Sequence, residues 1–151
     1  MYQSEKVELQ AKIAVILGRV SSKPQEDGYS IDGQINKGRD YCARKGLKVI
    51  QEYTFHESST RGCRPKFFEM IKFIEKQKEP VALICDKVDR LQRSFKEAPI
   101  IERLRKSGKL EIHLMTEQQI LHQNSTSQEL MLYNFFVMMA QNYTDNLSDN
   151  I

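Results

Sequence analysis

An arginine and a serine stand two positions apart where an apolar stretch of the sequence ends. Ile13 to Leu17 is a β-branched, apolar run of the kind that forms a strand buried on both faces. We expect this strand to stop at Gly18, so that Arg19 and Ser21 follow at its carboxyl end, where open α/β sheets bind ligands. On an extended backbone both side chains lie on one side, so the arginine can bind a phosphate that the serine attacks. A polar turn or a helix cap is the simpler alternative.

A second polar cluster, with Asp89, Arg90 and Arg93, follows the apolar run 81–85. Because neighbouring parallel strands end at the same edge of a sheet, we expect the two clusters to share one site. Guanidinium groups bind phosphate and stabilise transition-state charge, and a hydroxyl among arginines suits phosphoryl transfer through a covalent phosphoserine. No histidine lies nearby to complete an acyl-transfer triad, and no carboxylate cluster indicates a metal site. An ordinary ion pair between Asp89 and Arg90 is the alternative.

The rest of the sequence supplies elements that would position these clusters. Helical spacing of apolar residues predicts a helix over 31–45 that stops at Gly46, one that starts at Pro65, and one from Ser94 to about Gly108. Further strands are expected over 47–55 and 110–115. The order β-α-β-α-β-α-β predicts an α/β fold with a mainly parallel central sheet and helices on both faces.

A long helix is expected from Ser127. Its segment 130–140 is apolar nearly all round, so its own domain can cover only one side, and a second subunit is expected to cover the other. The helix runs to the end of the sequence without a cap, which suggests that it belongs to a longer element.

Composition adds limits on partners and location. No Lys or Arg occurs after Lys109, and the formal net charge is +3, which indicates one part that faces a polyanion and another that faces a protein. Cys42, Cys63 and Cys85 show no metal-ligand or redox spacing, so a reducing, cytoplasmic location is expected. No apolar run approaches the ~18 residues of a membrane span, and no membrane partner is expected.

Several separated segments resemble the motifs of the serine recombinases, the family of resolvases, invertases and large serine integrases. The segment from Arg19 to Gln25 is similar to the R-V-S-x-x-x-Q signature, and the segment from Asp89 to Ser94 is similar to the D-R-L-x-R-S motif. Residues 28–34, Gly-Tyr-Ser-Ile-Asp-Gly-Gln, resemble a segment typical of the large serine branch. The resemblance extends from residue 13 to the end of the chain and keeps the family's order of motifs.

The resemblance implies a resolvase-like three-layer domain that cleaves and rejoins DNA by transesterification. Ser21 would be the nucleophile that becomes linked to a DNA 5′-phosphate. The scissile phosphate would be bound by the arginines at positions matching the family: Arg19, Arg90, Arg93 and Arg64. Asp89 would orient this network, and Gln25 and Gln34 match glutamines near the site, although solvated polarity at a helix start is an alternative for both. The family's chemistry needs no cofactor and no metal.

The resemblance also implies double-stranded DNA as a partner and a homodimer that becomes a synaptic tetramer. It divides the chain into a polar lead-in (1–12), a catalytic domain (13–126) and the start of an oligomerisation helix (127–151) that precedes a DNA-binding region. Two correspondences stay open. The family's loop serine matches Ser58 or Ser59, and a family lysine matches Lys72 or Lys76.

Two other functions remain open from the sequence. One is a catalytically silent homologue whose long helix serves assembly alone, and the other is a flavodoxin-like module that binds phosphate without covalent chemistry. The presence of Arg19, Ser21, Arg90 and Arg93 together favours the active recombinase, since an inactive copy can lose them.

Overall fold

A computed structural model describes residues 9–21, 31–57, 65–87 and 98–149 of the chain. Strands and helices alternate along these ranges, as expected for an α/β domain. In chain order they are β1 (Ile13–Ser21), α1 (Ile31–Lys45), β2 (Lys48–Glu57), α2 (Pro65–Lys76), β3 (Val81–Cys85), α4 (Ala98–Lys106), β4 (Leu110–Leu114), β5 (Gln119–Leu121) and α5 (Ser127–Asp149).

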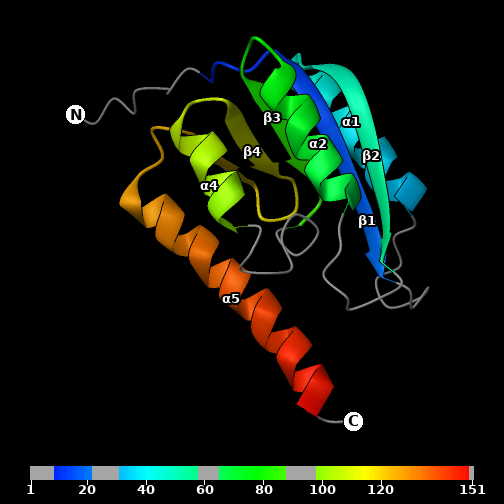
Figure 1. Cartoon of the computed structure of the whole chain (residues 1–151), viewed down its shortest axis with the longest axis vertical. Coiled ribbons are helices and arrows are strands. Elements are labelled where there is room, and N and C mark those ends of the chain that lie inside the picture. The colour runs from blue at the N-terminus through cyan, green and yellow to red at the C-terminus, as the bar shows by residue number, and fades with distance from the viewer. Residues whose placement is uncertain (1–8, 22–30, 58–64, 88–97, 150–151) are drawn as a thin grey trace.

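The strands form one sheet in the order β2-β1-β3-β4-β5. Pairs β1–β2, β1–β3 and β3–β4 are parallel, which confirms the predicted mainly parallel sheet, and β5 runs antiparallel to β4. β1 therefore occupies the interior of the sheet, with β2 on one side and β3 on the other (Figure 1). Strand β5 was not expected from the sequence.

Helices cover both faces of the sheet and give three layers (Figure 1). Alternate residues of β1 point to opposite faces, because the side-chain period of a strand is two. Ala14 and Ile16 belong to a core shared with α1, whereas Val15 and Leu17 belong to a larger core shared with α2, α4 and α5. The central strand is thus buried on both faces, as its continuous apolar run predicts.

Helix α1 packs unusually close to the carboxyl half of β1, and two glycines make this possible. A Cβ atom added to Gly38 would lie 2.8 Å from Ile16 Cγ2, and one added to Gly18 would lie 3.1 Å from Ile35 Cδ1. The helix ends where predicted, at Gly46, which has a φ of 72°. Side chains on the inner face of α1 are therefore held within reach of the strand ends.

The expected end of the first strand at Leu17 is wrong. Strand β1 continues to Ser21, because the backbone from Gly18 to Ser21 keeps pairing with β2, in register with Thr54 to Glu57. Its pairing with β3 does stop at Leu17, opposite Cys85. The last four residues of β1 thus extend beyond the neighbouring strand β3.

Helix α5 begins after Thr126, whose hydroxyl accepts a hydrogen bond from the Glu129 N–H at 3.2 Å. One side of the helix packs on the domain through Tyr133, and the other exposes large apolar side chains such as Met131 and Phe135. This arrangement agrees with the expectation that the domain covers only one side. Among the residues that the structure describes, no helix has the length and apolarity that crossing a membrane requires.

Candidate active site

Arg19 occupies the projecting end of β1 and is buried. It stands in line with Val15 and Leu17 along the strand, and only 1 % of its surface is exposed. Ser21 is the final residue of β1, two positions further, and its side chain lies outside what the structure describes. The arginine and the serine thus belong to one continuous strand rather than to a flexible turn, so the alternative of a polar turn does not hold for these two positions.

The Gln34 side chain of α1 holds the backbone of Arg19 on both of its polar groups. Gln34 Oε1 accepts the Arg19 N–H at 2.9 Å, and Gln34 Nε2 donates to the Arg19 carbonyl at 2.9 Å. These bonds take the place of a strand partner, because β3 has already ended opposite Leu17. Gln34 is 1 % exposed, so the alternative of solvated helix-start polarity is wrong for this residue. Both the oxygen and the nitrogen of its amide are thus engaged with the backbone of Arg19.

A second tie, which the sequence did not reveal, joins α1 to the ends of β3 and β4. Lys37 Nζ lies 2.6 Å from Asp86 Oδ1 and 3.2 Å from Thr116 Oγ1. The Thr116 hydroxyl donates to the same Asp86 oxygen at 2.9 Å, and the Thr116 N–H donates to the Asp86 carbonyl at 2.8 Å. Two features of the sequence could have indicated this cluster: a carboxylate directly after an all-apolar strand, and a lysine one helical turn after Gln34.

The remaining predicted site residues lie outside the described residues. These are Gln25, Arg64, Asp89, Arg90 and Arg93, together with the two candidate loop serines. Lys72 and Lys76 are described, and both are exposed on α2, so the choice between them stays open. Of the predicted site, the structure therefore describes the part on β1 and α1, with Arg19, Ser21 and Gln34.

The described cysteines and histidines have other roles. Burial raises the pKa of the Cys42 thiol to about 11 and raises the pKa of Cys85 still further, so neither is a thiolate nucleophile near neutral pH. His113 is buried, with Nδ1 2.7 Å from the Tyr41 hydroxyl and Nε2 3.4 Å from Glu111 Oε1. Within the described ranges, no three His, Cys, Asp or Glu side chains are grouped so that they could hold a metal ion.

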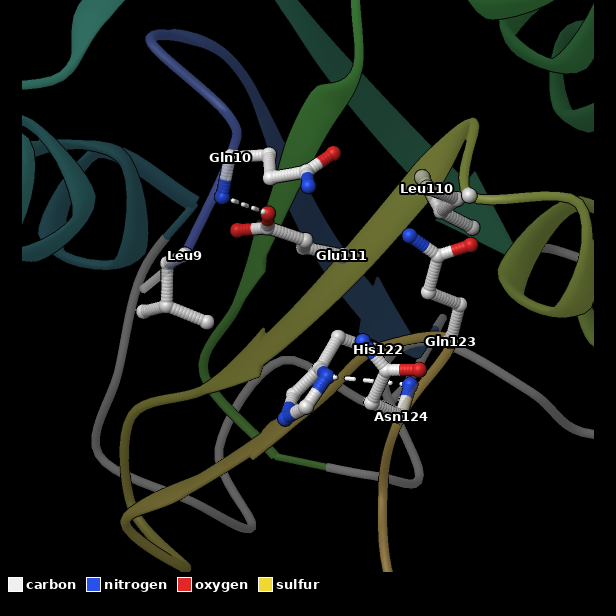
Figure 2. A pocket seen from close by; sticks show the side chains of 8 residues that line it. Leu9, Gln10, Leu110, Glu111, His122, Gln123 and Asn124 are labelled. Carbon is white, nitrogen blue, oxygen red and sulfur yellow. Dashed lines mark hydrogen bonds between the residues drawn. The ribbon is translucent and has the colours of Figure 1, made fainter. Parts of the chain in front are cut away.

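A small cavity lies near the amino ends of β1 and β4, away from the projecting end of β1 (Figure 2). Its volume is about 20 Å³, enough for a single water molecule. Glu111 Oε2 accepts the Gln10 N–H beside it at 2.8 Å, and His122 Nδ1 accepts the Asn124 N–H at 3.1 Å. Backbone N–H groups bond to both side chains, and a space of this size admits no molecule larger than water.

The resolvase N-terminal domain model matches residues 14–151, which is nearly the whole chain. The chain belongs to this family. The match confirms the resemblance to serine recombinases that the motifs carry, and it spans the sheet, α1 and α5 alike. None of the curated protein sequences matches the chain.

Solved structures of serine recombinases share the fold. The N-terminal catalytic domain of TP901-1 integrase is 24 % identical, with a TM-score of 0.64, and the alignment covers 89 % of this chain and 98 % of that one. The C-terminal catalytic domain of ISC1926 TnpA, an IS607-like serine recombinase, is 27 % identical, with a TM-score of 0.55 and coverage of 79 % and 75 %. A resolvase family site-specific recombinase from Streptococcus pneumoniae is 20 % identical, with a TM-score of 0.58 and coverage of 92 % and 93 %.

Proposed function

We propose that this resolvase-family chain is the catalytic domain of a DNA site-specific recombinase. The observation that carries the proposal is the placement of Arg19 and Ser21 at the projecting end of the interior strand β1, in a chain whose family is established. The carboxyl edge of a parallel sheet is where such folds bind their ligands. The backbone of Arg19 is held by Gln34, so the strand end is pre-organised for chemistry.

The reaction is a pair of transesterifications. Ser21 Oγ attacks the phosphorus of a DNA phosphodiester, the bond from phosphorus to the 3′-oxygen breaks, and the departing oxygen takes up a proton as the serine loses one. The DNA 5′-phosphate is then esterified to Ser21. A 3′-hydroxyl reverses the step on a different strand end. One phosphoester bond replaces another at each step, so the reaction needs no hydrolysis of a nucleotide as an energy source. The proposed steps also involve no metal ion.

Arginines supply the electrostatic stabilisation in this proposal. Arg19 contacts the scissile phosphate together with the arginines of the resemblance: Arg90, Arg93 and Arg64. Asp89 orients these guanidinium groups, and Gln25 supports them. Because Arg19 is 1 % exposed, it must become more exposed before it contacts a phosphate.

The open side of α5 supports assembly with a second copy of the chain. Phe135 is 53 % exposed and Met131 is 70 % exposed, and both lie on one open apolar face of the helix. Large apolar side chains gathered on one face mark a protein interface. We assign residues 13–126 to the catalytic domain and 127–151 to an oligomerisation helix that forms a homodimer and then a synaptic tetramer on double-stranded DNA. The buried cysteines are in keeping with a cytoplasmic location.

Substitution of Phe135 tests this assembly. Phe135→Glu places a charge on this apolar face, and we expect the dimer dissociation constant to rise by about tenfold or more in sedimentation experiments. Phe68→Glu is the matched control, because Phe68 is also an exposed phenylalanine, 45 % exposed, but lies on α2. Equal weakening by the two variants would mean that α5 is not the interface.

A covalent-adduct assay tests the proposed reaction. The full-length protein is incubated with a nicked duplex that carries its recombination site, and the mixture is run on a denaturing gel beside Ser21→Ala and Ser22→Ala. We expect a protein–DNA band from the wild type and from Ser22→Ala, and none from Ser21→Ala. A band that persists in Ser21→Ala would move the nucleophile. No band from any variant on a bound duplex would identify a catalytically silent homologue.

A further inference from the structure

Helix α1 reaches the ends of three neighbouring strands from one face. Gln34 bonds to the backbone of Arg19 in β1. Lys37, three residues later and so on the same face, contacts Asp86, directly after β3, and Thr116, two residues after β4. The strands lie in the order β1-β3-β4 in the sheet. Two adjacent positions of a single helix face therefore span the carboxyl edge of the sheet at the predicted site.

The Lys37 contact is built around a buried carboxylate. Asp86 is 2 % exposed, and its Oδ1 receives both the Lys37 ammonium and the Thr116 hydroxyl. Its backbone carbonyl accepts the Thr116 N–H, so the pairing of β3 with β4 continues one residue beyond the strands. A buried charge is tolerated only when it is paired and hydrogen-bonded. Lys37 is 36 % exposed at its side chain and supplies the neutralising charge from the solvent side.

We infer that Lys37, Asp86 and Thr116 form a positioning cluster for the recombination site. Together with Gln34, the cluster fixes the end of β3 relative to Arg19. Asp89 comes only three positions after Asp86 in the sequence, and Arg90 and Arg93 follow it. The cluster thereby fixes Asp86, which directly follows β3 and precedes this arginine-bearing segment in the sequence. The inference rests on the proposed function, and none of the three residues is assigned a contact with DNA.

A second ion pair on the same helix does not involve a strand end. Arg39 donates to Glu52 through Nε at 2.6 Å and through Nη2 at 2.7 Å. The side chain of Arg39 is 55 % exposed and that of Glu52 is 30 % exposed. The pair joins α1 to the body of β2 and not to a strand end. Exposed pairs of this kind contribute little to stability. Arg39 is therefore a matched control for Lys37: the same helix, the same charge and an equally short contact.

The test compares Lys37→Met with Arg39→Met in two measurements. The first is amide hydrogen exchange without DNA, where we expect protection of the Thr116 N–H to fall by about tenfold in Lys37→Met alone. The second is the rate of Ser21-dependent cleavage at saturating DNA, on the nicked duplex used for the adduct assay. Since small misplacement of catalytic groups is costly, we expect about a tenfold or larger loss in Lys37→Met, with DNA affinity within about twofold. Lys37→Arg keeps the charge and should recover most of the rate.

Three outcomes would overturn the inference. They are wild-type cleavage by Lys37→Met, equal losses in Arg39→Met, and a loss of DNA affinity as large as the loss of rate. If Lys37→Met does not fold, Lys37→Met combined with Asp86→Asn removes both charges and must show the same loss of rate. If the wild type formed no Ser21-dependent adduct, the proposed function would be overturned. The role of the cluster in positioning the recombination site would then be overturned as well. The exchange data would then show separately whether Lys37 holds the strand ends.

Discussion

Two buried polar clusters lie under the same face of α1, and they differ in what they hold. At the carboxyl edge of the sheet, Lys37 neutralises Asp86 and ties the ends of β3 and β4. One helical turn away, Tyr41 bonds to His113, and Glu111 accepts the backbone N–H groups of Gln10 and Ala11 at 2.8 and 2.9 Å. The second cluster fixes the chain as it enters β1, whereas the first fixes the end of β3, three positions before Asp89 in the sequence.

The role of a buried polar group depends on the backbone groups to which it is hydrogen-bonded. The Glu111 cluster lies beside the small cavity of Figure 2, yet its bonds end in backbone that leads only to the start of a strand. The contacts of Gln34 and Lys37 end at Arg19 and Asp86, next to motifs that carry the proposed chemistry. We therefore expect damage to the carboxyl-edge contacts to affect cleavage and stability together, and damage to the Glu111 cluster to affect stability alone.

The largest effect is expected from Gln34→Met. Methionine fills a similar volume but leaves the N–H and the carbonyl of Arg19 without their partner, so the free energy of unfolding should fall by about 3 kcal/mol. Cleavage should fall further than the unfolded fraction explains, because Arg19 is no longer held. Gln51→Met on β2 is the control, since Gln51 is exposed. Chemical denaturation and the adduct assay measure the two effects, and unchanged cleavage by a folded Gln34→Met protein would contradict the supporting role.

A smaller effect, on stability alone, is expected from Glu111→Gln. Burial raises the pKa of Glu111, but hydrogen bonds from His113, Ala11 and Gln10 outweigh it, so the pKa is lowered on balance from its usual 4.5. Loss of these charge-assisted bonds should cost about 1 kcal/mol at neutral pH, while cleavage stays within about twofold.

The pH dependence sharpens this prediction. A carboxyl group whose pKa is lowered by folding adds stability above its unfolded pKa and loses that contribution as the pH falls through the folded pKa. The stability difference between wild type and Glu111→Gln should therefore be full above pH 4.5 and shrink below it. Glu69→Gln, at an exposed site on α2, is the matched control for the substitution itself. A loss of cleavage in Glu111→Gln as large as in Lys37→Met would erase the distinction between the two clusters.

Most of the sheet could be predicted because several of its strands are short, continuous apolar runs, which are typical of buried strands. The run 81–85 is buried along its whole length, and Pro65 and Gly46 mark helix ends where the structure has them. The end of β1 could not be predicted, because its polar residues are strand only through pairing with β2. Strand β5 has three residues and is defined by its pairing with β4, so its own composition carried no signal.

The candidate site was predicted as a set of residue types but not as a set of contacts. Motif spacing singled out Arg19, Ser21 and Gln34, yet the hydrogen bonds from Gln34 to the Arg19 backbone depend on how closely α1 packs against β1. The pair Lys37 and Asp86 is 49 positions apart in the sequence, and only the fold brings it together. Sequence patterns locate chemistry along the chain, whereas support for that chemistry comes from the neighbouring layer.

The proposed nucleophile is tested most directly by identifying the protein atom that is bonded to the DNA. The covalent adduct is trapped on the nicked duplex, the DNA is removed by nuclease, and the protein is digested with trypsin, which leaves residues 20–37 as one peptide because Pro24 follows Lys23. Fragmentation should place a nucleotide on Ser21, joined through its 5′-phosphate. A nucleotide on Ser22, a linkage through a 3′-phosphate, or an unmodified peptide from a confirmed adduct would contradict the proposal that Ser21 becomes linked to a DNA 5′-phosphate.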